Sequence, residues 1–270
     1  DEIITPALTW VTTVYPIVNN GLIPVFVDVE KESFEIDVDK IEGAITPKTK
    51  AIMPVHLLGN PVKIEKIKEI AKKHNLIVIE DSCEAHGAEV NGKKIGSFGD
   101  MSTFSFFLSH HITTIEGGML LTNNEEYYEI GKALRAFGWI RDLKDKVEIG
   151  KKNPELDSRF LFVNMGFNIR PTEIQGAFGI HQIKKLEHFI KIRQDNTNYW
   201  NQVLSKFSNY IQLPTEEENT RHVYFGYAIL IKENKFFSYQ EFVDYLESKK
   251  IETRPIMAGN MVEQPSSTLY

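Results

Sequence analysis

Hydrophobic and polar positions along this chain follow two different spacings. Short runs of apolar and β-branched residues recur between segments whose apolar residues return every three or four positions. The runs predict five strands, at residues 24–29, 51–55, 76–80, 102–107 and 119–122. Because helical patterns separate them, we expect βα units that feed a mainly parallel sheet.

The helical spacing is clearest over residues 62–74. Ile64 and Ile67 fall on one face there, with lysines and glutamates opposite, which predicts an amphipathic crossover helix. Similar patterns predict helices over 125–137 and over 171–194.

The second half of the chain contains fewer strand signals. Residues 138–163 are polar and predict a long loop or irregular insertion. Residues 224–232 alternate like a strand, and Ser238 with Glu241 forms a capping box that opens a helix to Lys250. These pieces predict the start of a small α+β domain.

We therefore expect two domains of an α/β protein. Residues 1–195 would form a large α/β domain, and 196–270 the beginning of a smaller C-terminal α+β domain. The chain opens without methionine in a strand-like segment and closes without completing a helix. We expect a fragment that is truncated at both ends.

Composition narrows the possible functions. The 270 residues are 42% hydrophobic and 25% charged, which is typical of a globular protein. The net charge of -6, without a long basic block, argues against nucleic acid as a partner. No apolar run reaches the roughly 18 residues of a membrane span. A single cysteine, Cys83, and no signal-type opening favour the cytoplasm.

Three motifs follow one another between residues 79 and 118. Asp81 stands at the carboxyl end of a predicted strand, where open α/β sheets bind ligands. The ordered set resembles the DegT-type sugar aminotransferase family of pyridoxal-phosphate enzymes, and the resemblance covers nearly the whole chain. It implies a PLP-dependent transferase of fold type I, the aspartate aminotransferase-type fold. The segments that carry it are 5–10, 55–59, 79–88, 96–100, 105–118, 166–170 and 252–255.

His110 is the most informative residue in that resemblance. Counting from Ser105 and Gly117, it stands where most family members have lysine. Imidazole cannot form the lysine's Schiff base with pyridoxal 5'-phosphate, but it can move protons. The likeness to the histidine-bearing subset implies a sugar 3-dehydratase, with His111 in a structural role. With Cys83 alone, the iron-sulfur branch of such dehydratases is excluded, and we expect no metal.

The resemblance also implies a reaction. L-glutamate would convert pyridoxal 5'-phosphate to pyridoxamine 5'-phosphate, and the amine would condense with a nucleotide-linked 4-keto-6-deoxy sugar. His110 would act as base and then as acid while the C3 hydroxyl departs. Such a reaction belongs to deoxysugar biosynthesis of the lipopolysaccharide O-antigen type.

Roles for the other site residues come from the same resemblance. Asp81 would bind the pyridinium nitrogen, Ser105 the phosphate, Trp10 the face of the ring, and Glu84 the phenolic oxygen. Each also has a structural reading. Asp81 can cap a turn, Ser105 can bond to backbone, Trp10 can lie in the core and Glu84 can lie on the surface.

Three residues suggest the surroundings of the substrate. Asn168 would reach the phosphate in a neighbouring subunit, which implies a homodimer with shared active sites. Arg170 would bind the donor's carboxylate, and Arg254 belongs to the substrate-binding set. Phe137 departs from the family, which commonly has histidine at this position, and an apolar ring cannot make the same contact.

Two other functions stay open at this point. A sugar aminotransferase would need another lysine, and Lys93 and Lys94 are the nearest, in an Asn-Gly hairpin turn that points to solvent. A catalytically silent protein could instead bind the cofactor or the sugar. Released ammonia would indicate dehydration, and retained nitrogen would indicate transfer.

Overall fold

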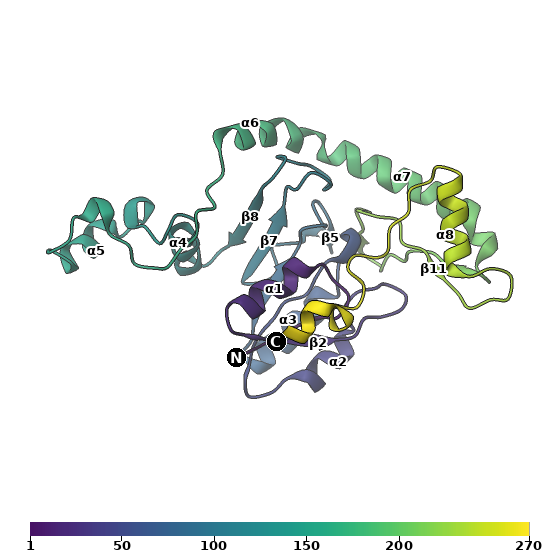
Figure 1. The fold of residues 1–270 in the computed structure, drawn as a ribbon, viewed down its shortest axis with the longest axis horizontal. Helices are drawn as coiled ribbons and strands as arrows, with labels where there is room; N and C mark the ends of the chain where they lie inside the picture. The colour runs from purple at the N-terminus through teal and green to yellow at the C-terminus, as the bar shows by residue number, and fades with distance from the viewer. Residues whose placement is uncertain (270) are drawn as a thin grey trace.

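The structure, a computed structural model, describes residues 1–269 and contains one dominant sheet (Figure 1). Within that range the sheet has six strands in the order β2-β1-β3-β4-β7-β8. All neighbouring strands are parallel except the antiparallel pair β7 and β8. The predicted α/β class and mainly parallel sheet are therefore confirmed. The strands are β1 Glu2–Pro6, β2 Ile23–Val27, β3 Thr49–Ile52, β4 Ile77–Asp81, β7 Met101–Ser105 and β8 Gly118–Thr122.

Helix α3, Ile64–His74, joins β3 to β4 and packs its apolar face on the sheet. Ile64 and Ile67 are fully buried there with Ile4 and Ile52 of the strands. The helix ends where Asn75 turns into the left-handed region. The predicted crossover helix is confirmed, and it starts two residues later than the pattern indicated.

Two short helices and two small sheets complete this part of the fold. Helix α1 is Val11–Asn19 and helix α2 is Val38–Ile41. Strands β5, Glu89–Val90, and β6, Lys93–Lys94, form the hairpin that the Asn-Gly pair predicts, and β10, Thr220–Arg221, pairs with β5. Strands β9, Ile211–Gln212, and β11, Leu230–Ile231, form the second sheet.

The polar segment after β8 is only partly irregular. Helix α4, Glu125–Leu134, ends three residues before the predicted end because Phe137 and Gly138 both have positive φ. Helix α5, Lys146–Lys152, lies inside the predicted loop. Its neighbourhood has a small core of Ala133, Ile140, Leu143 and Leu161.

The helix predicted over 171–194 is two helices. Helix α6, Glu173–Gln182, and helix α7, Leu186–Leu204, are joined by a 3-10 turn at Ile183–Lys185. They form one long run beyond the ends of β7 and β8 (Figure 1). Thr172 caps α6 with Gln175 in a capping box. Because α7 runs across residue 195, the domain boundary placed there stays a proposal.

The strand predicted over 224–232 is wrong except for Leu230–Ile231. Tyr224 has a φ of 48°, and its ring stacks on His222 with centroids 3.7 Å apart. The backbone of Phe225 donates to the Leu58 carbonyl at 2.7 Å instead of pairing in a sheet. The alternating pattern thus reflects a segment that wraps around the turn at Leu57–Gly59.

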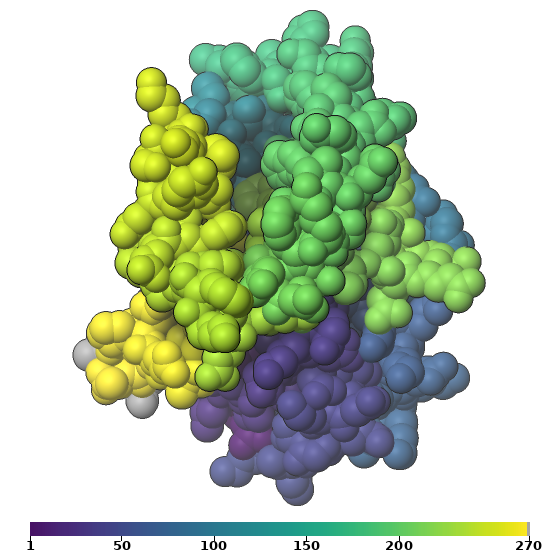
Figure 2. Space-filling view, turned by 90° about the vertical axis from the view of Figure 1, so that its right-hand side faces the viewer, coloured from purple at the N-terminus to yellow at the C-terminus, as the bar shows by residue number. Residues whose placement is uncertain are grey.

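The C-terminal segment returns to the N-terminal part of the chain. Helix α8, Tyr239–Ser248, carries the predicted capping box of Ser238 and Glu241. Farther on, Tyr15 donates to Ser266 at 2.8 Å. The space-filling view shows a hollow between α7 and the segment that carries α8 (Figure 2). The remaining 3-10 turns are Glu42–Ala44, Ile140–Asp142, Ser158–Phe160, Ser205–Phe207, Met261–Glu263 and Pro265–Leu269.

Candidate active site

The predicted site residues of the central motifs gather where β4 and β7 end. Asp81 is the last residue of β4, Ser105 is the last residue of β7, and β4 and β7 are neighbours in the sheet. His110 lies in the loop that follows β7. Parallel strands end at the same edge of a sheet, so the topology brings these side chains to one place.

The Asp81 carboxylate is held by two donors. Thr13 donates from Oγ1 to Asp81 Oδ2 at 2.7 Å, and the backbone of Cys83 donates to Oδ1 at 3.2 Å. Since the Thr13 proton is used in that bond, the Thr9 hydroxyl, 2.9 Å away, must donate to Thr13. Asp81 is 8% exposed, which leaves a small oriented carboxylate surface for a ligand.

Glu84 lies beside the turn at Leu57–Gly59. The backbone of Leu58 donates to Glu84 Oε2 at 2.6 Å. Leu58 has a φ of 55°, an uncommon conformation for a branched side chain, and this bond helps to hold it. Burial raises the pKa of Glu84 to about 7, with a smaller contribution from the charge of Asp81. Glu84 can therefore gain or lose a proton near neutral pH.

The loop that carries His110 is closed by hydrogen bonds across its base. Phe106 donates to the Gly117 carbonyl at 2.9 Å, and Thr114 donates to Phe106 at 2.9 Å. The His110 ring lies 5.1 Å from the ring of Phe225, between centroids. Burial lowers the pKa of His110, and the Cys83 carbonyl and the Asp81 charge oppose this effect. His110 is thus biased toward the neutral base form.

The two ring nitrogens of His110 have different surroundings. Nδ1 is buried and has no hydrogen-bond partner within residues 1–269, although the Cys83 carbonyl is near the ring. Nε2 is not fully buried, and it forms no side-chain hydrogen bond with residues 1–269. The nitrogen that faces outward is therefore Nε2. His111, by contrast, is buried and donates from Nε2 to the Val223 carbonyl at 3.0 Å.

Ser105 and Trp10 present polar and apolar groups at the same end of the sheet. The Ser105 hydroxyl accepts from the backbone of Phe107 at 3.2 Å, and its own proton is left for another acceptor. Trp10 occupies the N-cap position of α1 without a side-chain capping bond, and it is 53% exposed. Its ring is thus available for stacking, and the core reading of Trp10 does not match this exposure.

Asn168, Arg170 and Arg254 are exposed and lie on other segments. Arg170 donates to Asn168 Oδ1 at 3.0 Å and lies over the Phe137 ring, 4.8 Å from its centroid. Arg254 forms an ion pair with Glu252 at 2.8 Å. Within the described chain, no hydrogen bond joins these three side chains to Asp81, Ser105 or His110.

The structure adds residues that the sequence did not single out. Thr13 orients Asp81, and its only sequence signal is its position four residues after Thr9 near a helix start. His86 lies behind His110, with ring centroids 6.3 Å apart. Glu35 is buried, and burial first and the charge of Glu84 second raise its pKa. No local pattern identifies Glu35, because its environment depends on distant segments.

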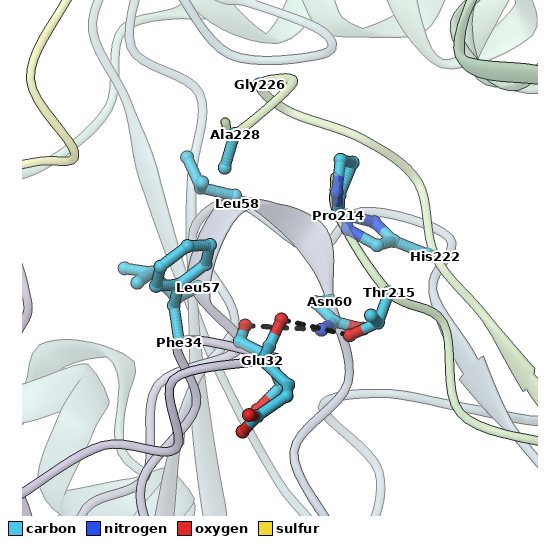
Figure 3. Close-up of a pocket in the computed structure, with 11 residues that line it drawn as sticks. Glu32, Phe34, Leu57, Leu58, Asn60, Pro214, Thr215, His222, Gly226 and Ala228 are labelled. Carbon is cyan, nitrogen blue, oxygen red and sulfur yellow. Dashed lines mark hydrogen bonds between the residues drawn. The ribbon is translucent and has the colours of Figure 1, made fainter. Parts of the chain in front are cut away.

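A small pocket lies behind the Leu57–Gly59 turn (Figure 3). Leu57, Leu58 and Phe34 line one side, and residues from 214–228 line the other. Asn60 donates to the Ser33 carbonyl at 3.5 Å, and Thr215 donates to the Glu32 carbonyl at 3.0 Å. The Thr215 bond ties the C-terminal half to the segment after β2, and the Asn60 bond joins that segment to the turn that supports Glu84.

The arrangement defines a class of protein. A mainly parallel sheet with an oriented aspartate at the end of β4 and a histidine loop after β7 is the architecture of PLP-dependent enzymes with the aminotransferase fold. The chain belongs to the DegT/DnrJ/EryC1/StrS aminotransferase family, whose profile matches residues 1–268.

Relatives with assigned activities are similar over the full chain. The GDP-4-keto-6-deoxy-D-mannose 3-dehydratase of Escherichia coli O55:H7 is 42% identical over 272 residues, covering 100% of this chain and 69% of that protein. A solved GDP-4-keto-6-deoxymannose 3-dehydratase with a histidine-to-asparagine change and bound GDP-perosamine superposes with a TM-score of 0.90 at 40% identity. The same dehydratase with a trapped PLP-glutamate geminal diamine also gives 0.90 and 40%. Both matches cover 100% of this chain and 69% of the solved one.

Among the helices within residues 1–269, none is long and apolar enough to cross a membrane.

Proposed function

We propose that this chain carries out the pyridoxamine-phosphate-dependent removal of the C3 hydroxyl from GDP-4-keto-6-deoxymannose, with L-glutamate as amino donor. The observation that carries the proposal is His110, whose outward Nε2 stands at the sheet edge that presents Asp81. The similarity to the 3-dehydratases named above supports both the sugar and the donor.

The residues at this edge fit the cofactor. Asp81 offers a carboxylate that Thr13 and Cys83 orient, which suits a protonated ring nitrogen. Ser105 has a free hydroxyl proton for a phosphate oxygen, and Trp10 has an exposed ring for stacking. Glu84, with its pKa near neutrality, suits the neighbourhood of a phenolic oxygen. When bound, pyridoxamine phosphate supplies an amine for the C4 ketone and a ring that withdraws electrons.

His110 supplies the proton chemistry in this proposal. Its lowered pKa favours the neutral imidazole, which has one bare nitrogen that can accept a proton at neutral pH. Once protonated, the same nitrogen can donate to the C3 hydroxyl, which then leaves as water. The Phe225 ring beside it limits access of bulk water to the imidazole.

The two lysines that an aminotransferase reading would need are engaged elsewhere. Lys94 forms an ion pair with Glu89 at 2.6 Å, and Lys93 lies over the Phe98 ring at 4.3 Å. Both belong to the β5-β6 hairpin. These contacts favour dehydration over amino transfer through a lysine.

The direct test combines a product assay with reduction by borohydride. Full-length protein, glutamate and the 4-keto sugar are expected to release ammonia and a 3-deoxy sugar, identified by mass spectrometry. Borohydride treatment of the PLP complex is expected to leave the chain mass unchanged, whereas His110→Lys, the positive control, gains the reduced cofactor. Covalent cofactor on the wild-type chain, or nitrogen retained in the sugar, would reject the proposal. A His110→Asn variant with undiminished turnover would reject a catalytic role for this residue.

We also propose a homodimer that works in the cytoplasm. Large apolar side chains are exposed on β8 and on α6, and exposed apolar surface of this kind is typical of interaction sites. Asn168 and Arg170 lie in the loop just before α6, so a partner packed on this face would receive them. These apolar residues are Met119, Leu120, Leu121, Ile174, Phe178 and Ile180.

A further inference from the structure

Segment 222–225 packs against the His110 loop without joining a sheet. Tyr224 within it has a φ of 48°, a conformation that few residues other than glycine adopt. The segment also passes very close to Gly59, where an added Cβ would lie only 2.7 Å from Val223 Cγ2. Such a path is not typical of a strand or a common turn, so its conformation depends on partners outside the segment.

The backbone N–H groups of this segment are all hydrogen-bonded. Those of Val223 and Phe225 donate to carbonyls of the turn at Leu57–Gly59, at 3.0 and 2.7 Å. Those of His222 and Tyr224 donate to side chains, at 2.9 Å in both cases. One side of the segment is therefore fixed to the turn that supports Glu84.

The four carbonyl oxygens of the segment accept hydrogen bonds from side chains of α7 and of the His110 loop. Two of the four are held by a single guanidinium, that of Arg193 on α7. Charged donors make stronger hydrogen bonds than neutral ones, so Arg193 contributes most to holding the carbonyl side. The four bonds are Gln194 to His222 at 3.0 Å, His111 to Val223 at 3.0 Å, and Arg193 to Tyr224 at 3.0 Å and to Phe225 at 2.9 Å.

Arg193 differs from the exposed arginines of this chain. Arg159 and Arg254 each form an ion pair with a carboxylate two residues away. Arg193 is half-buried, and within residues 1–269 it has no carboxylate partner. Its charge is therefore compensated by the two carbonyl dipoles that it binds, and these contacts tie α7 to the backbone of the segment.

The segment places the ring of Phe225 against His110. The two ring centroids are 5.1 Å apart with an angle of 34° between the planes, and the same ring lies 5.9 Å from His111. The His110 imidazole forms no side-chain hydrogen bond within residues 1–269, although the Cys83 carbonyl and the ring of His86 lie near it. Packing against Phe225 is thus a main constraint on the orientation of the imidazole.

We propose that Arg193 is a positioning residue for His110, because it binds the carbonyl of Phe225 and thereby keeps the Phe225 ring against the imidazole. The inference deepens the proposed function and rests on it, since the orientation of His110 affects turnover only if His110 is the base. A displacement of about 1 Å can cost about 10²-fold in rate. Arg193→Met removes both hydrogen bonds and is expected to lower kcat by about ten- to hundredfold.

The first test is a double-mutant cycle on full-length protein with Arg193→Met and Phe225→Ala. If Arg193 acts through Phe225, the double variant is expected to have nearly the same kcat as Phe225→Ala alone. Arg193→Lys keeps a cation at this position and is expected to recover part of the lost activity. Lys191→Met is the matched control, because it removes an exposed cation of α7 that pairs with Asp195, and it is expected to leave kcat unchanged.

The second test is an NMR titration of the His110 ring, which does not depend on turnover. His110→Asn assigns the signal. Burial lowers the pKa of His110, so loss of the Phe225 contact is expected to raise this pKa in both Phe225→Ala and Arg193→Met.

The charges around His110 determine how that titration is interpreted. Asp81, His86 and His111 face the imidazole and are present in every variant, so the guanidinium of Arg193 is the charge that changes. In the Phe225→Ala background, Arg193→Met is expected to add no further shift. A direct electrostatic effect of the guanidinium would persist in that background and would contradict the proposal.

Two other results would overturn the inference. One is a double variant in which the two losses of kcat add, and the other is an unchanged His110 titration in Arg193→Met. If Arg193→Met does not fold, Arg193→Lys takes its place in the cycle and in the titration. The expected titrations in a protein without dehydratase activity would reject the proposed function and leave the positioning of His110 by Arg193 standing.

Discussion

The hydrogen bond from Thr13 to Asp81 provides a sharp test of how the site holds its cofactor. Thr13→Val replaces a hydroxyl with a methyl group of similar shape at a position that is 1% exposed. The change removes the 2.7 Å bond to Asp81 Oδ2 and leaves the Thr9 hydroxyl without its acceptor. The carboxylate then keeps only the weaker 3.2 Å bond from Cys83.

The expected magnitude follows from these contacts. A hydrogen bond to a charged group contributes about 1.5–3 kcal/mol. Thr13→Val should therefore lower the free energy of unfolding by about 2 kcal/mol. If half or more of that loss also appears in cofactor binding, the affinity for pyridoxamine phosphate falls roughly five- to thirtyfold, because about 1.4 kcal/mol is tenfold.

Two measurements on full-length protein separate these effects. Urea unfolding gives the stability, and calorimetric titration with pyridoxamine phosphate gives the affinity. Thr12→Val is the matched control, since Thr12 is the neighbouring residue on α1 and is exposed. Thr13→Ser keeps the hydroxyl and should bind nearly as wild type does. Equal affinities for Thr13→Val and Thr12→Val would refute the role given to this bond.

Three further predictions concern stability and assembly. Glu80 is fully buried and accepts hydrogen bonds from three backbone donors and from His56 at 3.1 Å. Glu80→Gln places an amide among these donors. It should reduce the free energy of unfolding, measured in urea, by about 3 kcal/mol. Glu84 has a folded pKa of about 7, above its unfolded value, so the free energy of unfolding falls as pH rises from about 4 to 7. Glu84→Gln should remove about 3 kcal/mol of that fall. Parallel profiles of unfolding free energy against pH for the two proteins would contradict the assignment. Ile174→Asp with Phe178→Asp should convert a dimer into monomers in sedimentation equilibrium, and an unchanged mass would place the interface elsewhere.

The fold was largely predictable from the sequence because its main signals are local. Ile64 and Ile67 lie on one face of a single helix with charged residues opposite, and the structure contains that helix. Prediction failed where backbone conformation depends on distant partners. Tyr224 takes a positive φ because the chain wraps around Leu58, which lies far away in sequence. No pattern within 224–232 contains that information.

Some residues of the candidate site could likewise be predicted from local sequence, and others could not. Asp81 and Ser105 could be placed together because both end neighbouring strands of a parallel pair. Thr13 could not, since it reaches Asp81 across 68 positions of sequence from the start of α1. Glu35 is a stronger case, because a glutamate in a polar stretch gave no sign that its carboxyl group would be buried.

His110 shows which part of a mechanism can be predicted from the sequence alone. The residue type at that position is enough to exclude a lysine's covalent chemistry and to supply a proton carrier. Which nitrogen carries the proton is a separate question, because the two nitrogens of an imidazole differ only in their surroundings. Those surroundings come from the segment after β4, where the Cys83 carbonyl and His86 lie near the ring, and from Phe225 in the far half of the chain. The identity of the base is thus local, whereas its orientation is a property of the folded chain.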